Sequence, residues 1–317
     1  MKEIGGYIEL DTYNLPTLHE NALHLNCGRN ALAYLIESRK IKKIVLPYFL
    51  CNSVKEICDR YHLEIRFYHI NIDFIPDNNL KLADDEWLYV VNYYGQITVE
   101  MLKKIKEKHT RIIVDNAQAY FDMPIEDTDT IYTCRKYFGV SDGAILYTNS
   151  NIARDLPQDE SFERMRFLLG RFERTASEFY EEYVKNNDFF ENEPIRKMSK
   201  LTYNLLHGID YEFVKKRRTE NFSFLHKEFE KINRLKLTIP DGAFMYPLYI
   251  PNGEDIRKKL QAEKIYIPTL WNDVFYNCNE SDLECDMARN ILPLPVDQRY
   301  GIQDVTEIIN QVLSVIK

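Results

Sequence analysis

Between Asn30 and Asn149, strand-like apolar runs alternate with segments of helical apolar spacing, and this pattern constrains the fold most. The strand-like runs are Lys43–Pro47, Leu63–Ile70, Trp87–Tyr94, Ile112–Val114 and Thr130–Cys134. Helical spacing is found between them, over 30–40, 52–62 and 99–109. Such alternation is typical of a mainly parallel central sheet with helices on both faces, so we predict an α/β fold.

Chemically useful side chains fall where these strands are predicted to end. Pro47, Tyr94, Asp115 and Lys136 lie at or just after a strand end. Sheets of this kind bind their ligands beyond the carboxyl ends of their strands. We therefore expect a binding site at this edge of the sheet.

The second half of the chain predicts a helical segment followed by a smaller α/β unit. Residues 160–187 are charged and strongly helical, with an apolar stripe formed by Phe162, Met165, Phe167, Leu168 and Phe172. The later elements are expected to be a helix from about Asp210 to Phe229, a strand at Phe244–Ile250, a helix at Gly253–Lys264, a short strand at Ile265–Ile267 and a final helix from Gln303. We predict a large domain over residues 1–210, including a helical segment at 160–210, and a small C-terminal α/β domain over 211–317.

Composition limits the classes of partner. The 317 residues are 45% hydrophobic and 28% charged, as in ordinary globular proteins. A net charge of −8 argues against nucleic acid or an anionic membrane as the main partner. The six cysteines have no metal-ligand spacing, so we expect free thiols and no metal site. Neither a signal peptide nor a bilayer-spanning run is visible, and the cytoplasm is the expected location.

The segment from Arg111 to Gly143 carries the most specific chemical signal. Asp115 ends an apolar run, Gln118 follows three residues later, and Lys136 follows the next strand-like run. An aspartate can support a pyridinium ring, and a lysine can hold an aldehyde covalently. The pair would therefore suit a pyridoxal phosphate site.

Each candidate residue also has an ordinary structural explanation. Gly28, just before a helix, could bind a phosphate or could belong to a simple N-cap turn. Asp115 could be an N-cap or half of an ion pair, and Lys136 could be a solvated loop cation. Their joint occurrence at predicted strand ends favours the cofactor site. A nucleotide-binding GxGxxG or Walker motif is absent from the sequence.

The order of several segments resembles the DegT/DnrJ/EryC1/StrS sugar aminotransferases, a family of fold type I pyridoxal phosphate enzymes. The matching pieces are NCGRNAL, LPYFLCNSV, VNYYGQ, VDNAQA, TCRKYFGVSDGA, YPLYI, IYIPTLW and LPVDQRY. They cover most of the chain in the family's order. The resemblance implies the aspartate aminotransferase-like fold of PLP-dependent transferases, with pyridoxal 5′-phosphate as the cofactor. It also implies a homodimer.

The resemblance further implies a role for individual residues. Lys136 would bind the cofactor aldehyde and shuttle a proton, and Asp115 would pair with the pyridine nitrogen. The remaining implied cofactor contacts are Gln118 near the ring hydroxyl, Gly28, Arg29 and Thr133 at the phosphate, and Ser199 at the phosphate of a neighbouring subunit.

Three positions depart from the family's pattern. Gly28-Arg29 replaces the usual Gly-Thr, and residues 141–144 read Ser-Asp-Gly-Ala where the family has Gly-Glu-Gly-Gly. The resemblance aligns Cys51 most nearly with the aromatic residue that stacks on the cofactor, with Tyr48 and Phe49 beside it. These changes suggest a divergent branch of the family.

We hypothesise an aminotransferase that moves an amino group from an amino acid, plausibly glutamate, to a keto-sugar or similar carbonyl compound. The alternative is a non-catalytic descendant that keeps the fold as a binding or regulatory protein. Two further features have open interpretations. The run Lys215–Arg218 is expected to be a solvated helix face that could attract an anionic substrate. Trp271 could line the substrate entrance or belong to the core.

Overall fold

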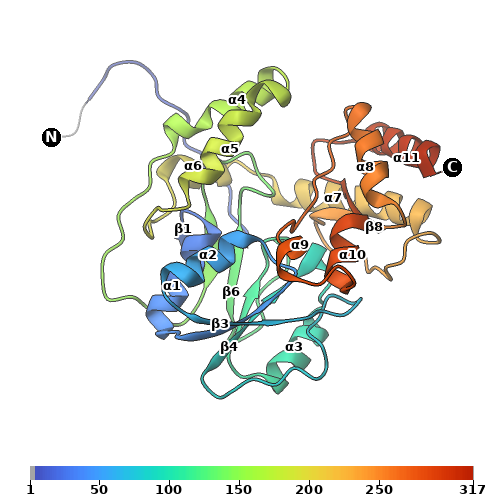
Figure 1. Cartoon of the computed structure of the whole chain (residues 1–317). Helices are drawn as coiled ribbons and strands as arrows, with labels where there is room; N and C mark the ends of the chain where they lie inside the picture. Colours follow the sequence, from blue (N-terminus) through green and yellow to red (C-terminus); the bar gives the residue numbers. More distant parts are fainter. Residues whose placement is uncertain (1–3, 317) are drawn as a thin grey trace.

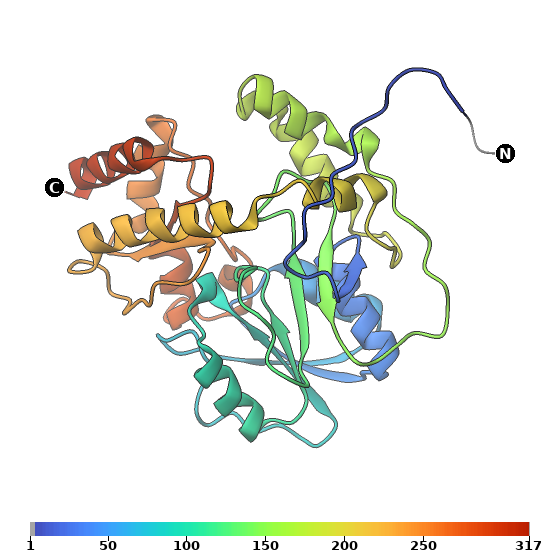
Figure 2. The same ribbon diagram turned by 180° about the vertical axis from the view of Figure 1, so that it is seen from behind.

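The computed structural model describes residues 4–316, which are built around a seven-stranded sheet of order β1-β7-β6-β5-β4-β2-β3 (Figures 1 and 2). The strands are β1 (Leu23–Leu25), β2 (Lys43–Pro47), β3 (Glu64–Tyr68), β4 (Glu86–Val91), β5 (Ile112–Asp115), β6 (Asp129–Thr133) and β7 (Ala144–Tyr147). The pairs from β3 to β6 are parallel, and β7 runs antiparallel to both β1 and β6. The predicted mainly parallel sheet is confirmed.

The central strands are short and buried, as expected where both faces of a sheet are covered. Ile44, Val45 and Leu46 of β2 are fully buried, and Ile113 and Val114 of β5 are at most 1% exposed. Ile44, Val45, Ile113 and Val114 are β-branched, and such side chains suit a pleated surface. These apolar runs therefore form the strands that the sequence indicated.

Helices α1 (Gly28–Arg39), α2 (Asn52–Arg60) and α3 (Val99–Lys108) connect the parallel strands. In the sheet, β3 lies next to β2 on the side away from β1, whereas β5 lies next to β4 on the side toward β1, so the two connections run in opposite directions. Right-handed crossovers consequently place α2 and α3 on opposite faces. Thr98 begins α3 by accepting a hydrogen bond from the Met101 amide at 3.3 Å.

The helical segment is more broken than its sequence suggested. It consists of two short 3₁₀ turns, α4 (Arg166–Glu173), α5 (Tyr180–Phe189) and α6 (Lys200–Leu206). Of the expected apolar stripe, Met165 is buried, but Phe162 is 66% exposed and Phe172 is 92% exposed. The stripe is not a core face, because α4 and α5 project from the body of the molecule (Figure 1).

The C-terminal unit, residues 211–316, has its own small sheet. It contains α7 (Tyr211–Phe229), β8 (Met245–Tyr249), α8 (Gly253–Ala262), α9 (Val274–Asn277), α10 (Leu283–Asn290), β9 (Ile291–Pro295) and α11 (Ile302–Ile316). Strands β8 and β9 pair in antiparallel register, and a second apolar cluster packs around them. The fold therefore includes a smaller C-terminal α/β part. The boundary at residue 210 stays a prediction.

The expected short strand at Ile265–Ile267 does not form. The Ile265 amide bonds to the Leu260 carbonyl at the end of α8, and the chain then continues irregularly toward Trp271. Strand β9, by contrast, was missed because its sequence, ILPLP, contains two prolines. Prolines remove backbone donors and are tolerated at the edge of a sheet.

The C-terminal unit is joined to the end of the large sheet through a buried carboxylate. Glu284 of α10 is 1% exposed and accepts a hydrogen bond from the Ile70 amide at 2.9 Å. The Nδ1 atom of His69 lies 3.2 Å from the same carboxylate. Residues just after β3 are thereby tied to α10.

All six cysteines are free thiols. Within residues 4–316, no helix has the length and apolar character required to cross a membrane. Over the same residues, no cluster of three or more His, Cys, Asp or Glu side chains is arranged to hold a metal ion.

Candidate active site

The sheet topology brings the predicted site residues to one edge. Leu25 at the end of β1 and Thr133 at the end of β6 both pair with Ala144 of β7. Strands β5 and β6 are parallel, with Asp115 in register with Ile131. The turn before Gly28, the Lys136 turn and Asp115 therefore all follow strands that end at the same edge.

Asp115 is held in a fixed orientation at the end of β5. Its Oδ1 accepts a hydrogen bond from the Ala117 amide at 2.8 Å, and its Oδ2 accepts one from the Tyr89 hydroxyl at 2.9 Å. These contacts restrict rotation of the carboxylate. The group is suited to stabilising a positive charge on a bound ligand.

Tyr89 was not among the site residues predicted from the sequence. It lies within β4, is 2% exposed, and reaches the carboxylate of Asp115 on the neighbouring strand. Burial, assisted by the charge of Asp115, raises the pKa of the Tyr89 hydroxyl well above its ordinary value. The hydroxyl thus remains a proton donor to Asp115 at physiological pH. Only the register of β4 on β5 could have revealed this pair.

Lys136 lies in the turn between β6 and β7 and is exposed. Its Nζ atom lies 5.5 Å from the centre of the Phe244 ring, which belongs to the C-terminal unit. Within residues 4–316, no carboxylate lies within ion-pair distance of this amine. The amine is therefore accessible to a ligand at the edge of the sheet.

The N-terminus of α1 is open. Cys27 precedes the helix without forming a side-chain cap, and a Cβ atom placed on Gly28 would meet nothing within 4 Å. The first amides of a helix lack intrahelical acceptors and carry partial positive charge, so they attract anions. A phosphate could approach the backbone closely at this point.

Two arginines lie near this helix start. Arg29 donates from Nη1 to the Asn187 carbonyl at 3.1 Å, but its buried Nε has no hydrogen-bond partner. Arg135 donates to the Asn187 side chain and packs over the Phe190 ring at 5.0 Å. Burial lowers the pKa of Arg135. Two cations with an unsatisfied donor favour an anionic ligand here.

Gln118 and Thr133 lie at the same edge but differ in their contacts. The buried Gln118 accepts a hydrogen bond from the Tyr94 amide at 2.8 Å, which leaves its amide nitrogen as the group available to a ligand. This contact fixes Tyr94 in a left-handed conformation with φ of 55°. Thr133 is partly buried at the end of β6.

Ser199 is placed differently from the other predicted residues. It is 1% exposed and begins α6, where its hydroxyl accepts from the Thr202 amide at 3.0 Å. The same hydroxyl donates to the buried Asp142 at 2.8 Å. Burial raises the pKa of Asp142 above its ordinary value, against the opposing hydrogen bonds from Ser199 and Thr202. Within its own chain, Ser199 is committed to this network.

An aromatic cluster lies beside the ends of β2 and β4. The ring of Trp271 lies 4.3 Å from Phe49, 5.2 Å from Tyr93 and 5.6 Å from Tyr94, measured between ring centres. Trp271 is only partly buried. Phe49 is fully buried, whereas Cys51 is exposed. Cys51, which the resemblance aligns with a stacking ring, therefore lies at the surface, and its correspondence to the stacking position stays a prediction.

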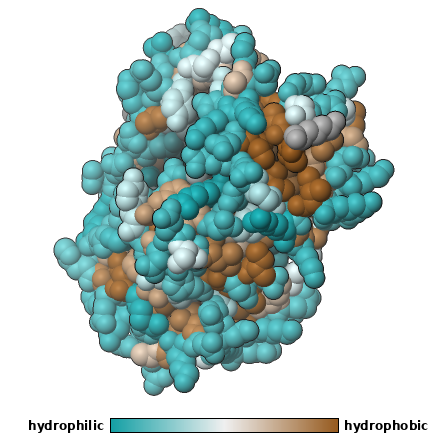
Figure 3. Space-filling model, turned by 45° about the vertical axis from the view of Figure 1, so that its right-hand side comes forward, coloured by the Kyte–Doolittle hydropathy of each residue, from teal (hydrophilic) through white to brown (hydrophobic). Residues whose placement is uncertain are grey.

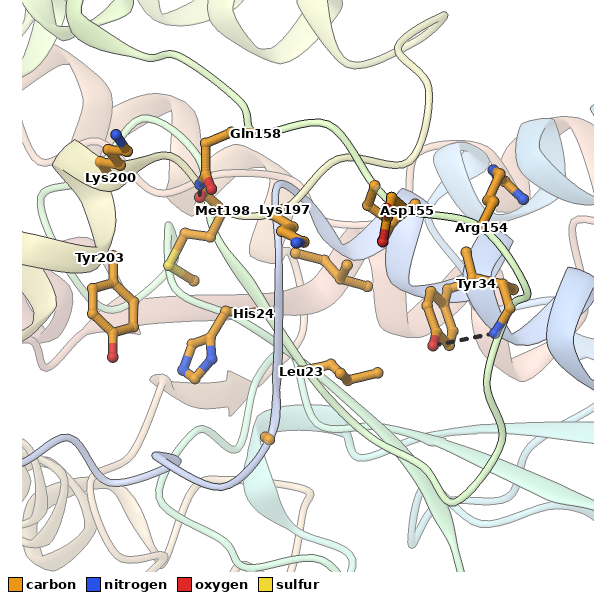
Figure 4. Close-up of a pocket in the computed structure, with 14 residues that line it drawn as sticks. Leu23, His24, Tyr34, Arg154, Asp155, Gln158, Lys197, Met198, Lys200 and Tyr203 are labelled. Atoms are coloured by element: carbon orange, nitrogen blue, oxygen red, sulfur yellow. Dashed lines mark hydrogen bonds between the residues drawn. The ribbon is translucent and has the colours of Figure 1, made fainter. Parts of the chain in front are cut away.

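A separate groove of about 500 Å³ lies along β1 (Figure 4). His24, Lys197, Met198 and Tyr203 line it together with several residues between 152 and 158. Of the residues discussed above, Leu25 lines this groove, but Asp115, Lys136, Gly28, Arg29, Gln118 and Thr133 do not. It is therefore distinct from the site at the edge of the sheet.

The residues at the edge fit pyridoxal phosphate. The uncapped start of α1, the open space at Gly28 and the unsatisfied Nε of Arg29 suit a phosphate. Asp115 suits a protonated ring nitrogen, and Lys136 suits an aldehyde.

The fold is shared with sugar aminotransferases of known structure. An aminotransferase of the DegT/DnrJ/EryC1/StrS type from Brucella abortus matches 93% of this chain and 86% of its own, with a TM-score of 0.62 and 15% identity. Sugar aminotransferase CalS13 from Micromonospora echinospora matches 92% of this chain and 87% of its own, with a TM-score of 0.64 and 14% identity. A candidate sugar aminotransferase of Streptococcus pneumoniae in its PLP form matches 94% of this chain and 88% of its own, with a TM-score of 0.67 and 13% identity.

No protein-family model matches this sequence, and no curated protein matches it at a significant level. The fold is nevertheless preserved over nearly the full length of the structural neighbours. The resemblance noted in the sequence is thus confirmed at the level of three-dimensional structure. This chain has the fold of the DegT/DnrJ/EryC1/StrS sugar aminotransferases.

Proposed function

We propose that this protein is a pyridoxal phosphate-dependent aminotransferase acting on sugars. The observation that carries the proposal is the joint placement of Asp115, Lys136 and the open start of α1 at one edge of the sheet. The structural neighbours support it, since they include sugar aminotransferases and one structure in a PLP form. When bound, pyridoxal phosphate supplies an aldehyde that carries the amino group and a ring that accepts electrons.

The chain's own residues would bind and orient the cofactor. The first amides of α1 would hold the phosphate, with Gly28 permitting close approach and Arg29 and Thr133 contributing donors. Asp115, oriented by Tyr89, would keep a proton on the ring nitrogen. Gln118 would contact the ring hydroxyl through its amide nitrogen. Ser199 would complete the phosphate site of a second copy only if its network with Asp142 rearranges.

Lys136 would have two tasks. Its amine would hold the aldehyde covalently and, once displaced by the amino donor, would move a proton between donor and cofactor. Its exposure and lack of a carboxylate partner support both. We propose an amino acid as donor, glutamate being the first to test, and a nucleotide-linked keto-sugar as acceptor.

The proposal is tested by the covalent link at Lys136. Purified protein incubated with pyridoxal phosphate and reduced with borohydride should gain one cofactor mass on the peptide containing Lys136, measured by mass spectrometry. Lys136→Ala should abolish this label while circular dichroism and thermal unfolding remain unchanged, because the side chain is exposed. Lys185→Ala, an exposed lysine of α5, serves as the matched control and should keep the label.

Two outcomes would contradict the proposal. A label that survives Lys136→Ala would refute the lysine assignment. If Lys136 is labelled but the absorbance of the bound cofactor does not change when amino donors are added, the result would instead favour a non-catalytic binding protein of this fold.

We further propose a homodimer located in the cytoplasm. Three apolar side chains in the first part of the N-terminal arm (residues 4–15) are almost fully exposed, with Ile4 at 95%, Tyr7 at 97% and Ile8 at 91%. This first part extends away from the body of the molecule (Figures 1 and 2). Such exposure is unfavourable in water and is relieved by a partner. The six free thiols support a reducing compartment.

A further inference from the structure

One member of the basic run Lys215–Arg218 is not part of a solvated face. Lys216 has a side chain that is 77% exposed, whereas Arg218 is only 1% exposed. The expectation of a solvated face is therefore wrong for Arg218. On α7, Arg218 shares the buried side with Val214 and Phe222, four residues away in each direction.

Arg218 connects the C-terminal unit to the Lys136 turn. Its Nη2 donates to the Tyr137 carbonyl at 3.2 Å, and its Nη1 donates to the Ala243 carbonyl at 2.9 Å. Its guanidinium lies 4.5 Å from the centre of the Tyr137 ring. The residue directly after Lys136 is thus held through both its backbone and its ring.

Gln298 completes the arrangement from the segment after β9. Its Nε2 donates to the same Tyr137 carbonyl at 2.8 Å, and its Oε1 accepts from Arg218 Nε at 2.8 Å. The Tyr137 carbonyl therefore receives two donors, and these donors are themselves joined. Arg218 also donates to the Phe244 carbonyl at 3.4 Å, and the Phe244 ring faces the Lys136 amine.

The charge of Arg218 is costly where it lies. Within residues 4–316, no carboxylate lies within ion-pair distance of it, because the nearby Asp297 is paired with Arg299 at 2.6 Å. Burial lowers the pKa of Arg218. A buried cation satisfied mainly by carbonyl groups is a poor source of stability compared with apolar packing. Its position therefore suggests a role beyond stability.

We propose that Arg218 and Gln298 are positioning residues that fix the turn carrying Lys136, and that this links the geometry of the lysine to the packing of the C-terminal unit. The proposal rests on the proposed function, in which Lys136 holds the cofactor. The proposal predicts that loss of either donor increases the mobility of this turn much more than that of the remainder of the fold.

The test compares Arg218→Gln, Arg218→Lys and Gln298→Ala with the wild type. Arg257→Gln is the matched control, since Arg257 is also a buried arginine of the C-terminal unit that donates to backbone carbonyl groups, those of Arg289 and Ile291. Gln298 is partly buried, so its replacement should fold even if Arg218→Gln does not.

The first readout needs no cofactor. Amide hydrogen exchange over residues 134–139 should accelerate by about tenfold or more in Arg218→Gln and Gln298→Ala, because the turn loses donors to Tyr137. Arg218→Lys should give only partial rescue, since an ammonium cannot reproduce the fork of donors. Arg257→Gln should leave exchange in this turn unchanged. Equal acceleration in the control, or none in the three variants, would overturn the proposal.

The second readout separates this inference from the proposed function. The rate of borohydride-trapped labelling of Lys136 should fall by about tenfold or more in Arg218→Gln. In the same variant kcat should fall strongly while KM changes little. The reason is that misplacement of a reacting group by about 1 Å can lower the reaction rate by about 100-fold. An unlabelled wild type would refute the proposed function. A labelled wild type with equally fast labelling of all variants would refute only the positioning role.

Discussion

Two titratable residues, the buried His19 and the partly buried Asp122, respond to acid in opposite directions. Burial lowers the pKa of His19 to about 4, and this ring lies between the Tyr147 hydroxyl and the Tyr120 carbonyl. Burial raises the pKa of Asp122 to about 6, against the opposing hydrogen bond from Asn92. His19 favours the fold above pH 6.5 and loses this contribution as pH falls through 4. Protonated Asp122 favours the fold below pH 3.8 and loses this contribution as pH rises through 6.

Replacing Asp122 by Asn should therefore stabilise the protein at pH 7 and have little effect at pH 4. The amide can still accept the hydrogen bond from Asn92 but carries no charge to bury. The expected gain at pH 7 is about 1–2 kcal/mol, reduced from the full shift because the side chain is partly exposed.

Urea unfolding of the wild type and Asp122→Asn at pH 4, 5, 6 and 7 measures this difference. His19→Gln provides the opposite case, since it removes the acid-sensitive contribution of the histidine. A stability difference between wild type and Asp122→Asn that does not change with pH would contradict the assignment.

The residues with local sequence signals were the ones that could be predicted. Asp115 and Lys136 each follow a recognisable strand, so their shared edge follows from the topology. Tyr89 could not be predicted, because its contact with Asp115 depends on the register of two strands. The burial of Arg218 had a signal, since Val214, Phe222 and Leu225 mark one side of the helix. The neighbouring basic residues obscured it.

At the scale of elements, the start of α1 and the start of α8 offer a direct comparison. Each helix begins with a glycine. A Cβ on Gly28 would meet nothing within 4 Å, whereas a Cβ on Gly253 would lie 2.5 Å from the backbone of Asn290. The first site is open, and the second is closed by packing.

Gly28→Leu should consequently leave the unliganded fold intact and weaken cofactor binding. We expect a change in stability of less than about 1 kcal/mol and a loss of affinity for pyridoxal phosphate of about tenfold or more, because the side chain occupies the path of the phosphate. Gly253→Ala should do the reverse, destabilising the protein without a specific loss of affinity. Thermal unfolding and cofactor titration by absorbance measure the two effects. Unchanged affinity in Gly28→Leu would exclude this helix start as the phosphate site.

The strands and helices between Lys43 and Asp115 were predicted within a few residues, including the four-residue β5, whereas β1 and β7 were not. Strand β1 has three residues and β7 has four. Both are defined by their pairing with a strand distant in sequence, since Leu25 and Thr133 meet Ala144 from opposite sides. The strand expected at Ile265–Ile267 had a suitable composition but no partner.

At the scale of the whole molecule, the surface is mostly hydrophilic with a few apolar areas (Figure 3). The exposed apolar residues of the N-terminal arm and of α4, such as Tyr7 and Phe172, lie outside both apolar clusters. Composition did not predict where they would gather, because surface exposure depends on the complete fold.

If the arm contributes to the proposed homodimer, the double variant Tyr7→Ser, Ile8→Ser should dissociate more readily. We expect the dimer dissociation constant to rise by about tenfold or more, since each apolar side chain buried at an interface contributes about 1–3 kcal/mol. Sedimentation velocity over a range of concentrations measures it. Glu9→Ser, an exposed neighbour, is the control. A wild type that remains monomeric at high concentration would contradict the proposed assembly.

The contact of Arg218 and Gln298 with Tyr137 also limits how this protein can be recombined. A chimaera that joins residues 4–210 to the C-terminal unit of another protein of the same architecture would fold around an intact large sheet. It would nevertheless lack the two hydrogen-bond donors to the Tyr137 carbonyl unless the incoming unit had an arginine and a glutamine at positions equivalent to Arg218 and Gln298. Exchange of the C-terminal unit should therefore succeed only when the incoming unit carries an arginine and a glutamine that reach the Tyr137 carbonyl.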